Sequence, residues 1–175
     1  MPNNDHDAGP EREDDRERSR QRVEDSALAI AARQEIEDLH AFFVGWFSGQ
    51  LANDDDTFQR GFARRFDPGF LLIPPAGTLL PLAKLSQSIR AGYGTNPDFR
   101  IQIRNVTLRR EIGKTAVLTY EEWQRSAKAS TPADNGRVAT VLMTPDRVAP
   151  GGFSWLHLHE CWLPRELMDA DPFDF

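Results

Sequence analysis

The sequence predicts an α+β domain in which helices pack on one face of a curved sheet of consecutive antiparallel strands. Two observations support this fold class. Apolar residues recur at helical spacing in the first half of the chain, and after Asp98 the apolar period falls to two, as in half-buried strands. Stretches such as "ADNG" and "APGG" separate the later segments, as turns separate neighbouring strands.

The longest predicted helix runs from Ser26, whose side chain can cap the first turn, to Gly49, which can end the helix. Charged residues such as Arg33 and Glu37 fall on the side opposite to the apolar ones. The apolar residues are Leu28, Ile30, Ala31, Ile36, Leu39, Phe42, Phe43, Trp46 and Phe47.

A second, shorter helix is predicted within residues 53–69, where phenylalanines recur every four positions. Three aspartates precede it and could bind a cation. Carboxylates at a helix start, however, meet unpaired N–H groups and the positive end of the helix dipole. We therefore interpret Asp55 or Asp56 as the cap of this helix.

The remaining elements complete the α+β order. A short strand in "GFLLIPPAG" (69–77) ends at its prolines, and a third helix covers residues 81–89. Four strands then follow, within residues 99–110, 111–127, 136–148 and 152–164.

Composition limits the class of protein. The 175 residues suit one domain, and 39% hydrophobic with 27% charged residues is ordinary for a globular protein. The net charge of −6 argues against nucleic-acid binding, and prolines break the longest apolar runs, which argues against a membrane span. We expect a domain over residues 26–165, a charged tail or fraying helix extension over 1–25, and an acidic tail over 166–175.

Cysteine usage and the N-terminal residues indicate the cytoplasm. Cys161 is the single cysteine, so no intramolecular disulfide can form, which fits a reducing compartment. The first fifteen residues lack the apolar stretch of a signal peptide. No H-E-x-x-H or C-x-x-C motif is present, and we expect neither a cofactor nor a metal.

The order of elements, together with "FLLIPPAG" and the closing "WLHLHECWLP", resembles the NTF2-like superfamily over residues 27–164. It is most similar to the SnoaL-like and DUF4440-like members and to the association domain of calcium/calmodulin-dependent kinase II. The resemblance implies a cystatin-like cone, in which the antiparallel sheet wraps around the long N-terminal helix and leaves an open pocket. It also implies a homodimer through the outer face of the sheet. Such folds host many unrelated functions.

One family residue can be compared directly. In ketosteroid-isomerase-like members the general base is an aspartate before "P-x-G" on the first strand. Here Pro74 stands at that position in "IPPAG". Because proline has no titratable group, steroid isomerisation by that route is not expected.

The closing strand carries candidate catalytic residues. If the strand alternates regularly, Trp155, His157, His159 and Cys161 share one face. His157 and His159 would then have side chains about 7 Å apart. They could line a pocket, lie in a subunit interface, or bind a metal with a third ligand.

The preceding strands offer carboxylates and arginines. Tyr120 and Glu122 share one face of their strand, whereas Glu121 and Trp123 share the other. A glutamate in an aromatic, partly desolvated site can act as an acid or base near neutral pH, paired with a histidine. Alternatively, the glutamates form a structural network with Arg104, Arg125 or Arg137. Arginines that point into an empty cone would favour an anionic ligand.

Aromatic residues are expected at the mouth of the cone. Phe43, Trp46 and Phe66 are predicted to line its apolar wall, and Tyr93, between two glycines, could act as a lid.

Three functions follow from these residues. The first is binding of a small, possibly anionic organic ligand, with acid–base catalysis of isomerase, dehydratase or cyclase type by Glu121 or Glu122 and His157 or His159. In this hypothesis Tyr120, Trp123, Arg104 and Arg137 join the mouth residues in ligand binding. The second is a non-catalytic association module. The third is a metal-dependent enzyme that uses His157 and His159.

Overall fold

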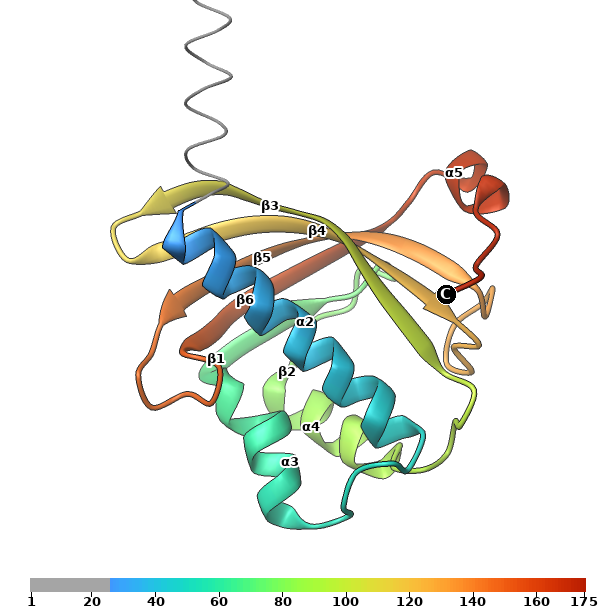
Figure 1. Ribbon diagram of the computed structural model, residues 1–175, viewed down its shortest axis with the longest axis horizontal. Helices are drawn as coiled ribbons and strands as arrows, with labels where there is room; N and C mark the ends of the chain where they lie inside the picture. The colour runs from blue at the N-terminus through green and yellow to red at the C-terminus, as the bar shows by residue number, and fades with distance from the viewer. Residues whose placement is uncertain (1–25) are drawn as a thin grey trace, which may run out of the picture.

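The computed structural model describes residues 26–175, so the tail predicted over residues 1–25 lies outside the described residues. The helices and strands are α2 (Ala27–Phe47), α3 (Asp55–Gly61), the 3₁₀ turn η1 (Ala63–Arg65), β1 (Phe66–Ile73), β2 (Leu80–Pro81), α4 (Leu82–Ala91), β3 (Arg100–Ile112), β4 (Thr115–Arg125), β5 (Asn135–Pro145), β6 (Phe153–Trp162) and α5 (Arg165–Ala170). Apart from β2, the helices and strands from α2 to β6 follow the predicted order, and the short helix α5 begins the segment that was expected to be an acidic tail (Figure 1).

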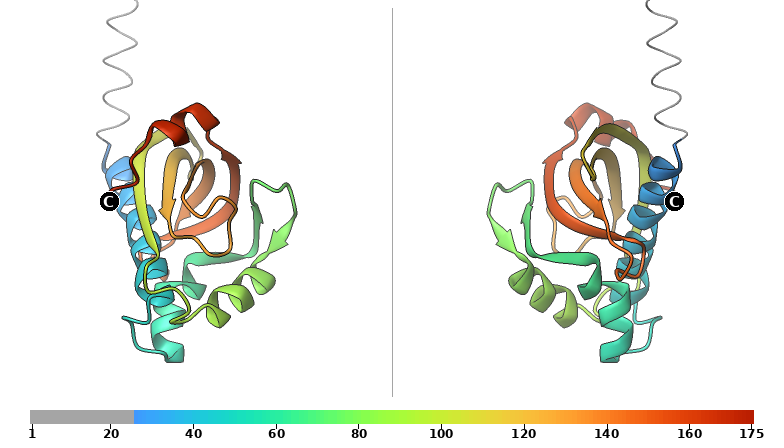
Figure 2. Two further views of the ribbon diagram at one scale, coloured as in Figure 1. Left: turned by 90° about the vertical axis from the view of Figure 1, so that its right-hand side faces the viewer. Right: turned by 90° about the vertical axis from the view of Figure 1, so that its left-hand side faces the viewer.

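The six strands form one sheet in the order β2-β1-β6-β5-β4-β3. Strands β3 to β6 are consecutive and antiparallel, as predicted. The short strand β2 was not predicted, and β1 pairs parallel with β6, which departs from the wholly antiparallel sheet that was expected. Figures 1 and 2 show the sheet strongly curved, with α2 along its open side and α3 and α4 near one end. The predicted α+β class, with a curved sheet around a long N-terminal helix, is therefore confirmed.

Helix α2 forms where its caps and apolar face predict it. The Ser26 side chain accepts a hydrogen bond from the Ala29 N–H at 3.1 Å, and Gly49 follows the helix with a φ of 74°. Ile36, Leu39 and Trp46 are buried in the core, whereas Ile30, also predicted on the apolar face, is 62% exposed. Within residues 26–175, no helix is both long enough and apolar enough to cross a membrane.

Aromatic packing fixes α3 beneath α2. Phe58 and Phe62 lie 5.3 Å apart between ring centroids and are fully enclosed by the core. The cap of α3 is Asp54, whose Oδ1 accepts from the Thr57 N–H at 2.7 Å, so the predicted caps Asp55 and Asp56 were wrong by one or two positions. Asp55 and Asp56 instead occupy the first helical turn, where their charges favour the N-terminal end of the dipole.

A buried ion pair joins α2 to η1 and β6. Glu35 Oε2 accepts from Arg65 Nη1, and Glu35 Oε1 accepts from Trp155 Nε1 at 2.9 Å. Burial raises the pKa of Glu35, while Arg65 and the Trp155 hydrogen bond oppose that rise. Gly151 packs its backbone directly against this carboxylate, and a Cβ at that position would overlap Glu35 Oε2.

We predict that Gly151→Ala destabilises the fold by about 3 kcal/mol, because the methyl group would separate a buried ion pair. Urea unfolding followed by circular dichroism measures the loss. Gly69→Ala is the matched control, since the nearest atom to its Cβ is the end of the exposed Asp67 side chain. That control should stay within about 0.5 kcal/mol of the parent. Equal losses in the two variants would contradict the assigned role of the Glu35 pair.

Candidate functional site

A pocket of about 180 Å³, the inner compartment, lies between α2, α4 and the concave face of the sheet. Its walls are apolar and its floor is polar. The wall residues include Leu39, Phe43, Phe47, Leu72, Leu85, Ile89, Phe99, Ile101 and Leu158, and the floor residues are His40, Tyr120, Glu122, Gln124, Arg137 and Glu160. Apolar walls with a few convergent polar groups are usual for a small-molecule site.

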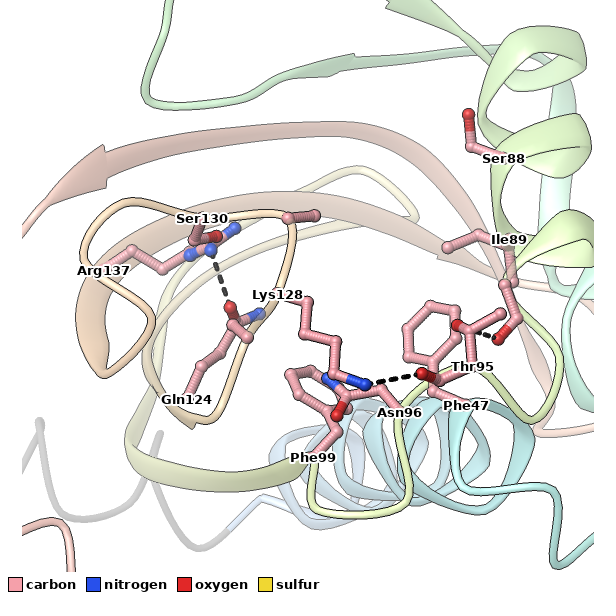
Figure 3. A pocket seen from close by; sticks show the side chains of 13 residues that line it. Phe47, Ser88, Ile89, Thr95, Asn96, Phe99, Gln124, Lys128, Ser130 and Arg137 are labelled. Atoms are coloured by element: carbon pink, nitrogen blue, oxygen red, sulfur yellow. Dashed lines mark hydrogen bonds between the residues drawn. The ribbon is translucent and has the colours of Figure 1, made fainter.

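A second space of about 340 Å³, the outer compartment, adjoins the inner one. The two share lining residues from Phe47, Ile89 and Phe99 to Gln124 and Arg137. Figure 3 shows the outer compartment, with Arg137 and Gln124 on one side and the end of α4 on the other.

Polar groups also line the outer compartment. Lys128 extends across it and donates from Nζ to the Thr95 carbonyl at 2.8 Å (Figure 3). Asn96 donates from Nδ2 to the Ser126 carbonyl at 2.7 Å, and its buried Oδ1 has no partner within residues 26–175.

The polar floor is a continuous hydrogen-bonded network across β4, β5 and β6. Arg137 Nη1 donates to Glu160 Oε2 at 3.0 Å, and Arg137 Nη2 donates to Gln124 Oε1 at 2.9 Å. Gln124 in turn donates from Nε2 to Glu122 Oε1 at 2.5 Å. The strands bring these side chains together because Glu122 pairs directly with Arg137, and alternate residues of each strand share the concave face.

Helix α2 contributes the last member of the network. His40 Nε2 lies 3.2 Å from Glu122 Oε2, and His40 Nδ1 lies 2.6 Å from the Ile36 carbonyl. Carbonyl and carboxylate oxygens both accept, so a His40 ring protonated on both nitrogens satisfies both contacts. Burial lowers the pKa of His40, but the charge of Glu122 and the two hydrogen bonds outweigh burial and raise that pKa above its ordinary value.

The two buried glutamates differ in protonation. Burial raises the pKa of both, yet Arg137 and His40 together lower that of Glu122 to about 2. Burial and the neighbouring Glu122 charge raise the pKa of Glu160 to about 7, despite its bond to Arg137. The pair therefore binds one proton near neutral pH, and Arg137 and His40 favour its place on Glu160 over Glu122.

Tyr120 supplies a hydroxyl donor for which residues 26–175 provide no acceptor. Its side chain is buried, its ring lies 5.4 Å from the His40 ring, and Oη has no hydrogen-bond partner among residues 26–175. Burial, Glu122 and Glu160 raise the pKa of Tyr120 well above its ordinary value, so the hydroxyl keeps its proton. The Nε of Arg137 is likewise buried without a partner in the described chain.

Four of the residues predicted from sequence line the inner compartment: Phe43, Tyr120, Glu122 and Arg137. Trp46 and Phe66 do not line either compartment, because they are packed inside the hydrophobic core. Tyr93 is held in place rather than free as a lid: its Oη donates to the Leu51 carbonyl at 2.8 Å.

Three other candidates lie on the outer face of the sheet. Glu121 accepts hydrogen bonds from Asn105 Nδ2 and from Trp123 Nε1, both at 2.9 Å. Arg104 pairs with Asp171 of the C-terminal segment. Of the glutamate–arginine pairs in the alternative network, Glu122 lies opposite Arg137, whose charge lowers its pKa. Arg137 itself bonds to Glu160, which was not among the predicted partners.

The expected location of the two strand histidines in the pocket is corrected by the structure. A register shift opposite Leu142 and Met143 breaks the alternation of β6, so Trp155 faces inward whereas His157 and His159 do not. His159 is exposed, and neither histidine lines a compartment. Among the described residues, no group of three or more His, Cys, Asp and Glu side chains gathers around them or elsewhere.

Sequence reasoning missed two of the four charged residues of the floor, His40 and Glu160. Each has a visible signal. His40 interrupts the apolar side of α2, and Glu160 falls on the same strand face as Leu158, so both positions point into the interior. A titratable residue inside an apolar pattern is the signal that finds them.

No protein-family model matches the chain, and no curated protein matches it either. Solved structures do. An NTF2-like protein of unknown function from Pseudomonas aeruginosa is 28% identical, with a TM-score of 0.64, over 77% of this chain and 99% of that one. A CaMKII hub from S. rosetta is 16% identical, with a TM-score of 0.60, over 79% and 98%.

A third solved structure, an uncharacterised protein with a cystatin-like fold from Caulobacter vibrioides, is 15% identical, with a TM-score of 0.56, over 81% of this chain and 94% of that one. The chain therefore has the NTF2-like, cystatin-like fold, and the superfamily that its sequence resembles is the one in which its structural neighbours lie.

Proposed function

We propose that the protein binds a small organic acid in the two-compartment pocket and that Glu160 exchanges a proton with this ligand. One observation carries the proposal. The Tyr120 hydroxyl, buried and without a partner in the described chain, lines the same apolar compartment as Arg137. A buried donor without an acceptor is costly, and a ligand oxygen would supply the acceptor.

The charge of the floor favours an anion. His40 and Arg137 are cations and Glu122 is an anion, so the three leave one positive charge whenever Glu160 is protonated. A carboxylate would compensate that charge and accept from the Tyr120 hydroxyl.

The volume limits the ligand. A cavity of about 150 Å³ accommodates one benzene ring, so the 180 Å³ inner compartment suits one ring or a short branched chain with a carboxylate. The outer compartment, with Lys128 and Asn96, would take further polar substituents.

Glu160 gives this site a group for general acid–base chemistry. A side chain whose pKa lies near 7 can both donate and accept a proton at neutral pH. Proton transfer of this kind serves isomerases, dehydratases and cyclases alike. We infer that Glu160, rather than His157 or His159, fills the catalytic role that the sequence suggested for a histidine.

Self-association is the second candidate function, and the likeness to a CaMKII hub supports it. The outer face of the sheet exposes Val138, His159 and Cys161, which a second copy could cover in a homodimer. We also propose a cytoplasmic location, which suits the single free Cys161. A purely associating protein would tolerate substitutions at the pocket floor, so pocket variants distinguish the two functions.

We predict that Tyr120→Phe weakens the binding of benzoate, used as the first probe, about fivefold to tenfold, because one hydrogen bond is lost. Isothermal titration calorimetry measures the change. The unliganded variant should be as stable as the parent or more stable, since the removed hydroxyl has no partner in the described residues. His159→Ala, on the outer face, is the matched control and should leave binding unchanged. Equal affinities of parent and Tyr120→Phe would exclude the hydroxyl as a ligand contact.

We predict that the free energy of unfolding decreases between about pH 4.5 and 7. Glu160 releases its proton at about 4.5 when unfolded and about 7 when folded, so the folded state holds the extra proton throughout that window. The decrease is on the order of 2 kcal/mol. The raised pKa of His40 adds a further loss that sets in above pH 6.5.

Urea unfolding at a series of pH values measures this dependence. Glu160→Gln should reduce the decrease between pH 4.5 and 6.5 to the part that Glu35, whose pKa is also raised, contributes, and it should leave the loss at higher pH. Glu111→Gln, an exposed carboxyl on β3, should change neither. An unchanged profile in Glu160→Gln would show that another group titrates.

A further inference from the structure

The C-terminal segment, residues 165–175, folds back onto the outer face of β3 and β4. In Figure 1, α5 lies beyond the end of β6, and the C-terminus returns beside β4. Three contacts fix the end of the segment. Arg104 Nη1 donates to Asp171 Oδ2 at 2.5 Å, Arg125 Nη1 donates to the Phe173 carbonyl at 3.3 Å, and the rings of Phe173 and Trp123 lie 5.5 Å apart.

Arg104, Trp123 and Arg125 together form a receptor, which we call the outer-face site. The Arg104 guanidinium lies 4.6 Å from the Trp123 ring and 5.6 Å from the Phe175 ring, so an aromatic residue of the segment continues the cation–π contact made within the sheet. Trp123 is only 5% exposed although it lies on the outer face. The site thus matches an acidic segment that bears phenylalanines, in both charge and shape.

The link between β6 and these contacts is loosely packed. Helix α5 buries none of its residues, and Leu167 is 54% exposed. A space of about 560 Å³ remains between the segment and the body, lined by Trp162, Pro132 and Phe173 among others. The segment is therefore anchored by Asp171 and Phe173, whereas the stretch that links β6 to these residues makes few contacts with the rest of the domain.

We propose that the outer-face site binds the C-terminal segment of a second copy of this chain, by exchange of the segment that occupies it here. A second copy is the expected partner, because its C-terminal segment carries the same residues that fill the site within one chain. Exchange of a terminal element is a low-cost route to a dimer, because each contact of the closed chain is made again between copies. Each copy then contributes Asp171 and Phe173 to a site that is incomplete without them.

Concentration decides between the two arrangements. A segment tethered by a short linker competes at an effective concentration in the millimolar range, so the closed monomer is favoured in dilute solution. The wild-type chain should accordingly shift from monomer to dimer as its concentration rises.

Charge reversal in full-length chains tests the exchange. One chain carries Arg104→Glu and the other carries Asp171→Arg, so each alone opposes like charges at its own site. In a reciprocally exchanged mixed dimer, the intact Arg104 of one chain meets the intact Asp171 of the other, and the two reversed residues meet at the second site. We expect a 1:1 complex, measured by size-exclusion chromatography with light scattering, with at least tenfold tighter association than either chain shows alone.

Three controls make the result decisive. Both substitutions in one chain should restore wild-type behaviour, and Arg110→Glu, an exposed arginine on the same strand, should not replace Arg104→Glu in the mixture. Adding Phe173→Ala to the Arg104→Glu chain should weaken the complex. Circular dichroism confirms that each chain folds. A mixture of folded chains that contains only the species formed by each chain alone overturns the proposal, as does a mixed complex that Phe173→Ala leaves unchanged.

Discussion

The contact between His40 on α2 and Glu122 on β4 is the one on which the pocket depends. It joins the central helix to the middle of the curved sheet through two charged groups that are both buried. Two apolar residues at these positions would pack together and close the space. Charged groups instead require partners, and Gln124, Arg137 and Glu160 satisfy them in turn. The requirement to pair His40 and Glu122 thus organises the whole polar floor.

The two faces of the sheet have different chemistry because strand residues alternate. On β4, Glu122 and Gln124 join the buried network, whereas their neighbours Glu121 and Trp123 bond to each other on the outside. The same strand therefore lines the pocket with one face and contacts the C-terminal segment with the other. The Gly136 N–H lies 3.2 Å from Met168 Sδ of α5. Gly136 immediately precedes Arg137, so the C-terminal segment contacts the backbone next to an arginine of the pocket.

Local patterns predicted most of the fold. The caps and apolar spacing of α2 and the period of two in β3 to β6 depend on neighbouring residues, and both are found. The pairing of β1 with β6 could not be predicted in this way, since nothing in the local pattern specifies a partner so distant in sequence. The site was predicted less well for a related reason. A single register shift on β6 exchanges which residues face inward, so His157 and His159 replaced Glu160 in the sequence-based hypothesis.

The pairing of β1 with β6 also bears on how the chain folds. Its partners, such as Leu72 and Leu158, come from opposite ends of the domain, so their contact closes a long loop. Contacts of that kind form slowly, whereas the β3–β4 hairpin and α2 need only nearby residues. We expect the antiparallel hairpins of β3 to β6 to form early and the pairing of β1 with β6 to complete the sheet last. Leu72 of β1 and Leu85 of α4 line the pocket, so the hollow in which a ligand would bind exists only once folding is complete.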